Sequence, residues 1–213
     1  MDTARAASEL GGALMKNWIS RTLIVLVVVI AAPLAASADT WQIDPVHTTV
    51  AFSVRHMTIS TVRGQFDKVA GTITANDNDP AAAVIEATID TASIDTHSPD
   101  RDSDLKSANF LDVTKYPTMT FKSKKIEAAG SGKYNVVGDL TLHGVTREVT
   151  LAVVVPGAPI KDPWGNTRAG ASATTTISRK DFGLTFNKMI EAGGAVVGDA
   201  VAVEIDVEAV KKK

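Results

Sequence analysis

The feature that most constrains the fold is an alternation of apolar and other residues, which recurs from residue 41 almost to the end of the 213-residue sequence. In residues 48–56, for example, Val50, Phe52 and Val54 are separated by smaller or polar side chains. The same period of two recurs in residues 85–90, 118–122, 135–143, 148–155 and 201–208. Because successive side chains of a strand point to opposite faces, each run predicts a strand with one dry and one wet face. Such strands are typical of antiparallel sheets.

Turn-forming residues separate these runs and set the size of the sheet. Clusters lie at residues 76–80, 130–132, 143–144, 156–157, 163–166 and 193–194. We therefore expect at least about eight strands in an antiparallel sheet that must protect its edges, as a sandwich or as a closed barrel. Small residues in or beside the strands fit the bends and bulges that let a sheet curl, and they favour the barrel: Gly71, Gly138, Gly170, Ala171, Ala173 and Gly183.

Residues 98–109 break the alternation and predict one short helix. Ser98 has the type of an N-cap residue, Pro99 would occupy the first helical position, and Asp100 and Asp102 fall in the first turn. We expect this helix to lie across an end of the sheet.

The N-terminal region has the order of a secretory signal peptide. Lys16 and Arg21 precede an apolar run at residues 23–32, and small residues follow at 36–38. The run is shorter than the roughly 20 residues that span a bilayer, so an uncleaved anchor is the weaker alternative. We predict a signal peptide at residues 1–38, cleavage after Ala38 and a mature domain at residues 39–213. Met15 is the more natural start, which would make residues 1–14 an overrun of the start site.

Charge and cysteine content exclude several classes of function. The 22 basic and 24 acidic side chains give a net charge of -2 and form no basic stripe, so we expect no nucleic-acid partner. The absence of cysteine from the sequence excludes disulfides, thiolate metal sites and cysteine nucleophiles.

Sequence motifs for catalysis or metal binding are missing as well. There is no phosphate-binding glycine loop, nucleophile elbow, zinc-binding histidine pair or EF-hand spacing. His47 and His56 would lie roughly 30 Å apart on one straight strand and could not share a metal. We therefore expect no metal and no cofactor, although a Ser/His/Asp arrangement stays open because serine and aspartate are plentiful. The charged clusters at 101–102 and 179–181 predict exposed ion pairs or, alternatively, an arginine that holds a polar head group at a cavity mouth.

A set of short motifs gives the sequence its resemblance to a known family. They are WQIDPVH at 41–47, VAFSVRH at 50–56, GQF at 64–66, SIDT at 93–96, RD at 101–102, NFLD at 109–112, YP at 116–117, TFKS at 120–123, GDLTLHGVT at 138–146, RKDFG at 179–183 and VGD at 197–199. In this order and spacing they resemble the YceI-like family of periplasmic lipid- or polyisoprenoid-binding proteins. The resemblance covers residues 40–210.

The resemblance implies an all-β fold, an extended lipocalin-like antiparallel barrel of about eight strands with one short helix and a long apolar cavity. It implies a non-catalytic periplasmic protein that holds a polyisoprenoid or fatty-chain ligand for carriage, storage or sensing. A homodimer and transient membrane contact are partners that the family suggests. Leu111 departs from the pattern, because an aromatic residue is expected beside Phe110.

Alternation and position in these motifs select the candidate site residues. The residues expected to line or close the cavity are Phe52, Val54, Phe66, Phe121, Leu140, Leu142, Phe182 and Leu184. His47, His56 and Arg101 are the candidates for contact with a ligand head group. Two alternatives are a periplasmic hydrolase that acts on a lipid-like substrate at the barrel mouth, and an interaction module with a filled interior. A hollow interior would argue against the second.

Overall fold

The computed structural model describes residues 38–76, 79–189 and 195–213. The expected signal peptide, apart from its last residue, and the turn at 193–194 lie outside the described residues. Within the described ranges, no helix combines the length and the apolar character needed to cross a bilayer.

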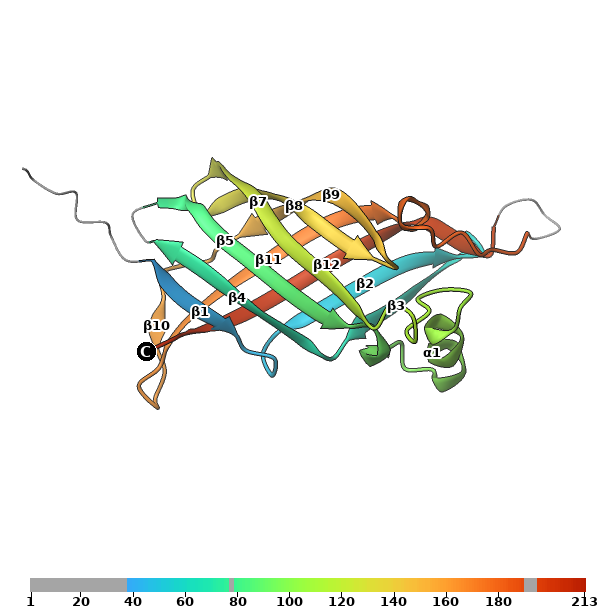
Figure 1. The fold of residues 1–213 in the computed structure, drawn as a ribbon, viewed down its shortest axis with the longest axis horizontal. Helices are drawn as coiled ribbons and strands as arrows, with labels where there is room; N and C mark the ends of the chain where they lie inside the picture. Colours follow the sequence, from blue (N-terminus) through green and yellow to red (C-terminus); the bar gives the residue numbers. More distant parts are fainter. Residues whose placement is uncertain (1–37, 77–78, 190–194) are drawn as a thin grey trace, which may run out of the picture. The chain divides into compact units, whose positions relative to one another are not determined.

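Twelve strands and three short helices make up this part of the chain (Figure 1). The strands are β1 (Asp39–Ile43), β2 (Thr49–His56), β3 (Ser60–Phe66), β4 (Val69–Asn76), β5 (Asp79–Asp90), β6 (Ile94–Asp95), β7 (Thr118–Gly130), β8 (Lys133–Leu142), β9 (Val145–Val154), β10 (Ile160–Lys161), β11 (Thr167–Ser178) and β12 (Val197–Lys211). The helices are the 3-10 turns η1 (Thr91–Ser93) and η2 (Arg179–Phe182) and the α-helix α1 (Pro99–Lys106).

Eight of the strands form a closed antiparallel barrel, in the order β11-β9-β8-β7-β5-β4-β1-β12. The barrel closes where β11 pairs with β12, from Arg168 opposite Val210 to Ser178 opposite Ala200. Closure leaves these strands without a long unpaired edge, which is the reason a barrel was expected. The predicted fold class is confirmed.

One edge of β12 pairs with two strands, one after the other along its length. Ala209 and Lys211 pair with β1, whereas residues 197–206 pair with β2, and β2 continues to β3 and β6. The turn between β1 and β2 begins at Asp44, whose carboxylate accepts the Val46 N–H at 2.9 Å. The expectation that His47 and His56 share one strand is therefore wrong, because His47 lies in this turn and β2 begins at Thr49.

Helix α1 lies beside one end of the barrel, as expected, but it is shorter than predicted (Figure 1). It ends at Lys106 because Ser107 adopts an extended conformation. Ser98 has the backbone of an N-cap but makes no side-chain capping bond. Asp102 instead stabilises the preceding segment, because its carboxylate accepts hydrogen bonds from the N–H and the hydroxyl of Thr96.

A tight turn at His143 and Gly144 joins β8 to β9. Both residues have positive φ, 52° and 74°, the conformation of a two-residue hairpin turn whose twist matches the strands. A Cβ at Gly144 would lie 2.5 Å from the Tyr116 ring, and that ring also packs on His143 at 4.4 Å. The turn is thereby fixed to the segment that follows α1.

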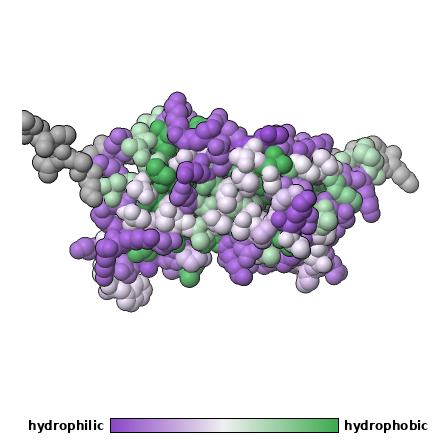
Figure 2. Space-filling model, in the orientation of Figure 1, coloured by the Kyte–Doolittle hydropathy of each residue, from purple (hydrophilic) through white to green (hydrophobic). Residues whose placement is uncertain are grey.

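The main apolar core lies where this segment, η2 and the adjoining strand ends meet. Its buried members are Val50, Phe66, Val69, Ile94, Leu111, Met119, Leu142, Phe182 and Leu184. The face drawn in Figure 2 carries many hydrophilic residues, with paler and some hydrophobic residues among them. The core lies at one end of the barrel, and all of these buried members except Phe182 also line the cavity described below.

Candidate functional site: an apolar cavity in the barrel

A cavity of about 310 Å³ lies inside the barrel. It is lined by the inward side chains that the alternation predicts, such as Val201, Val203, Ile205 and Val207 of β12. Among the described residues that line it, no polar atom contributes surface to the cavity. The volume falls within the range of about 300–1,000 Å³ that is typical of small-molecule sites. This interior excludes the filled-barrel alternative.

Seven of the eight predicted cavity residues line this space: Phe52, Val54, Phe66, Phe121, Leu140, Leu142 and Leu184. Phe182 is not among the lining residues and is only 1% exposed. It ends η2, and Gly183 then turns the chain in a left-handed conformation with φ of 78°. Phe182 is part of the core that packs beside the cavity.

The three head-group candidates are not brought together, and none of them lines the cavity. His47 lies in the β1–β2 turn and His56 at the opposite end of β2. Arg101 lies on α1, where its Nε donates to the Thr96 hydroxyl at 2.8 Å and its Nη2 to the Thr96 carbonyl at 2.7 Å. A head-group role for these residues stays a prediction.

Arg179 is a charged residue that does line the cavity, and it is only 4% exposed. Its guanidinium donates to the carbonyls of Gly198 at 3.0 Å, Phe186 at 3.0 Å, Val197 at 3.4 Å and Leu184. Burial lowers the pKa of this guanidinium, and Asp199 partly opposes the shift. Arg179 therefore joins the segment that follows η2 to the first residues of β12 at the barrel end.

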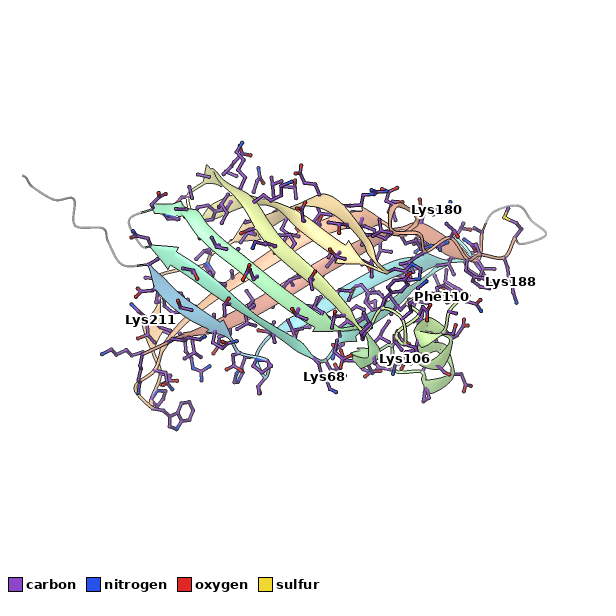
Figure 3. All side chains as sticks on the ribbon, viewed as in Figure 1. Lys68, Lys106, Phe110, Lys180, Lys188 and Lys211 are labelled. Carbon is purple, nitrogen blue, oxygen red and sulfur yellow. The ribbon has the colours of Figure 1, made fainter. Side chains whose placement is uncertain are left out.

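The sequence placed Arg179 in a charged cluster but gave no sign that its side chain is buried. Helix α1 and the segment after it also contribute lining residues that were not predicted, namely Leu105, Phe110 and Leu111. Figure 3 labels Phe110 beside α1, and its ring packs edge-on against Phe186 at 5.3 Å. Leu111, where the family resemblance leads us to expect an aromatic residue, thus lines the cavity with an aliphatic side chain.

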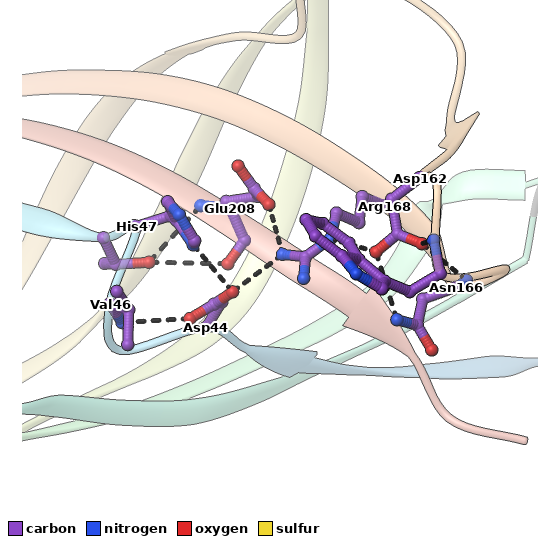
Figure 4. A network of polar contacts seen from close by, with 9 residues as sticks. Asp44, Val46, His47, Asp162, Asn166, Arg168 and Glu208 are labelled. Carbon is purple, nitrogen blue, oxygen red and sulfur yellow. Dashed lines mark hydrogen bonds and ion pairs between the residues drawn. The ribbon is translucent and has the colours of Figure 1, made fainter.

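An ionic network occupies the end of the barrel where β1, β11 and β12 meet (Figure 4). Arg168 donates to Asp44 and Asp162, both at 2.7 Å, and to Glu208 at 2.5 Å. Nδ1 of His47 lies 2.9 Å from the carboxylate of the same Asp44. We refer to these five residues as the Arg168 network.

The network shifts the pKa values of its members. Hydrogen bonds from His47 and then Arg168 hold the pKa of Asp44 far below its usual range. Arg168 lowers the pKa of Asp162 to about 2, and the three carboxylates raise the pKa of the guanidinium in return. All of these charges are fixed at the barrel end and none faces the cavity.

Asp44, His47 and Glu208 offer ligand atoms that lie within 4.8 Å of one another, close enough to hold a metal ion. However, the guanidinium of Arg168 already pairs with both carboxylates. A cation would compete with this fixed positive charge, so the group is better explained as a structural ion pair than as a metal site.

Comparisons with known proteins agree with this architecture. The model of the YceI-like domain matches residues 41–209. A UPF0312 protein of Vibrio vulnificus (strain YJ016) is 37% identical over 191 residues, covering 88% of this chain and 95% of that protein.

Solved structures show the same barrel. The Campylobacter jejuni YCEI protein is 32% identical and superposes with a TM-score of 0.64, over 75% of this chain and 90% of that one. A polyisoprenoid binding domain from Saccharophagus degradans shares the fold at 16% identity, with a TM-score of 0.60 over 81% of this chain and 98% of the other. The match across the whole barrel shows that this chain belongs to the YceI-like family.

Proposed function

We propose that the chain is a periplasmic binding protein that holds one long-chain isoprenoid or fatty amphiphile in its cavity, without catalysis. The observation that carries the proposal is the apolar character of the cavity, to which the described lining residues contribute no polar surface. Such a space provides no hydrogen-bond partners for a sugar, a nucleotide or a peptide backbone. Their polar groups would lose hydrogen bonds to water on entering it.

A hydrocarbon tail gains free energy in the same space. Each buried methylene contributes about 0.8 kcal/mol, so ten of them would contribute about 8 kcal/mol before the costs of association. A net affinity in the micromolar range, about -8 kcal/mol, therefore requires burial of more than ten methylenes. Because the charges of the Arg168 network lie outside the cavity, the tail supplies the affinity and the head group remains at the surface.

The ligand class has support from a structural neighbour. The domain from Saccharophagus degradans that shares this barrel is described as polyisoprenoid binding. The order of residues 16–38 supports export, and the proposal includes removal of residues 1–38 and transient membrane contact to collect or deliver the ligand. N-terminal sequencing of protein from the periplasm should begin at Asp39.

The decisive experiment is extraction of lipid from protein purified without detergent, followed by mass spectrometry. We expect a long-chain amphiphile close to one per protein, or uptake of added isoprenoid alcohol by protein purified empty. Val203→Asn places an unpaired amide in the cavity and should weaken uptake at least about tenfold. The control is Val154→Asn, at a position 42% exposed on β9. Failure to recover or take up any such ligand would overturn the proposal.

The same material tests the hydrolase alternative. A carrier returns an ester-linked lipid intact after prolonged incubation, and it loses binding gradually as apolar side chains are shortened. Turnover of the ester that a single polar substitution abolishes would establish an enzyme instead.

A further inference from the structure

Two phenylalanine rings of the cavity wall lie directly over glycines of neighbouring strands. A Cβ at Gly64 would be 2.6 Å from Cζ of Phe52, and a Cβ at Gly138 would be 2.5 Å from Cζ of Phe121. Real Cβ atoms do not approach other atoms this closely, so each ring occupies the place of a missing side chain. The rings are packed against the wall and not extended across the lumen.

The strand register explains why these pairs form. Gly64 of β3 is directly opposite Phe52 of β2. On the other side of the barrel, Phe121 of β7 is opposite Leu140 of β8, and Gly138 is two residues along the same strand and face. Packing of an aromatic ring over a glycine on the adjacent strand also fixes register in sheets.

These two rings differ from the other phenylalanines that line the cavity. Phe66 and Phe110 are each only 9% exposed and are held in the core or against another ring. Phe52 and Phe121 are only half-buried although both line the cavity, and Phe52 also packs on the Phe66 ring at 5.7 Å. They are therefore the large side chains whose position most directly sets the free width of the lumen.

We infer that Phe52 and Phe121 select the ligand by the girth of its tail, and that Gly64 and Gly138 act as positioning residues that keep the lumen open. The inference rests on the proposed function. Since the cavity presents no polar surface from its described lining, shape is the property by which it can distinguish one tail from another. A side chain in place of either glycine would press on the ring and narrow the lumen, and at Gly64 it would also meet Cγ2 of Thr96 at 2.6 Å and the Asp95 carbonyl oxygen at 2.9 Å.

The binding test uses two alcohols of equal carbon number, the methyl-branched geranylgeraniol and the straight-chain 1-eicosanol. Phe121→Leu and Phe52→Leu replace a ring with a smaller side chain and so widen the lumen. The straight-chain alcohol then loses contacts with the wall that the bulkier branched alcohol retains. We expect the ratio of dissociation constants to shift about tenfold toward the branched alcohol. Gly138→Ala should shift the ratio in the opposite direction.

Gly170→Ala is the matched control. Gly170 also lies within a strand, β11, but its Cβ would meet only the Val207 carbonyl oxygen at an ordinary 3.6 Å. It should leave the ratio unchanged. An unchanged ratio in both leucine variants, with wild-type protein that binds both alcohols, would overturn the inference and leave the proposed function standing. Wild-type protein that binds neither alcohol would overturn both.

A ligand-free measurement tests the positioning role of the glycine. A Cβ at position 138 also presses on the Lys122 carbonyl oxygen at 2.6 Å, so Gly138→Ala should destabilise the fold by itself. In a double-mutant cycle, Phe121→Leu should relieve part of that loss, seen as a smaller drop in urea midpoint than the two single changes add up to. Strict additivity would show that the glycine does not position the ring. If Gly138→Ala does not fold, recovery of folding in the variant that also carries Phe121→Leu would show that the glycine positions the ring.

Discussion

The two ends of the barrel are held by different forces. At one end, the Arg168 network joins strands by charge, with the Arg168 side chain 19% exposed. At the other, η2 and the segment after α1 pack an apolar core around Phe182, and Arg179 is buried there on backbone carbonyls. Salt and pH act on ion pairs, even partly buried ones, more than on buried apolar contacts. The network end should therefore respond to solution conditions, whereas the packed end should respond to changes of side-chain volume.

The largest expected effect is on the packed end. Phe182→Ala removes a ring that is 1% exposed and should lower the free energy of unfolding by about 4 kcal/mol. Urea denaturation measures this loss. Val154→Ala, at a position 42% exposed, is the control and should change stability little. A loss below about 1 kcal/mol for Phe182→Ala would mean that the core does not hold this end.

The second-largest loss of stability is expected for Arg179→Met. It keeps much of the side-chain volume but leaves the carbonyls of Leu184, Phe186, Val197 and Gly198 without their donor, which should cost about 3 kcal/mol. Arg101→Met, which removes hydrogen bonds at α1, is the matched control and should cost clearly less. Equal losses from the two changes would contradict the role assigned to Arg179.

At the network end, Arg168→Met should lower the thermal midpoint by a few degrees, because three carboxylates lose their shared cation. The loss should be larger in low salt than in high salt, where the remaining repulsion is screened. The loss from Phe182→Ala should depend much less on salt. A similar salt response in both variants would remove the distinction between the ends.

Acid should also weaken the network end selectively. The pKa values of Asp44 and Asp162 are lowered in the folded protein, that of Asp162 to about 2, so these groups bind fewer protons folded than unfolded. Their stabilisation is present above the ordinary carboxyl pKa near 4 and is lost as pH falls from about 4 toward 2. Thermal midpoints measured across this range should fall less steeply for Arg168→Met than for the wild type.

The smallest effect is expected for the ion pairs along the outer wall. Lys124 pairs with Glu148 at 2.8 Å, but both side chains are about half exposed. Lys124→Met should leave the thermal midpoint nearly unchanged, since exposed pairs contribute little. A drop comparable with that of Arg168→Met would show that the whole surface, and not one end, is stabilised by charge.

The sequence predicted the barrel walls well because the cavity and the solvent impose opposite demands on alternate residues. In β12, Val201, Val203, Ile205 and Val207 face the cavity as their spacing indicates. The alternation was less visible in β11, where Ala171, Ala173 and Thr175 also line the cavity. Small and polar side chains can occupy such positions without an apolar pattern, so composition alone does not reveal them.

The candidate site was predictable on the walls but not at the ends. Burial of Arg179 depends on two carbonyl-bearing segments that meet only in the folded chain. His47 contacts Asp44 only three residues earlier, but Asp44 meets Arg168 and Glu208, which are far apart in sequence, only in the folded barrel. Local patterns specify which face of a strand is apolar, whereas these contacts depend on tertiary pairing.

The position of β12 has a consequence for the order of folding. This strand pairs with β11 along one edge and with both β1 and β2 along the other, yet it follows all of them in the chain. A polypeptide that emerges N-terminus first, from a ribosome or a translocation pore, therefore remains an open sheet until residues 197–211 arrive. Contacts of such high sequence separation form slowly, so the apolar inner face of the nascent sheet stays uncovered in the interval.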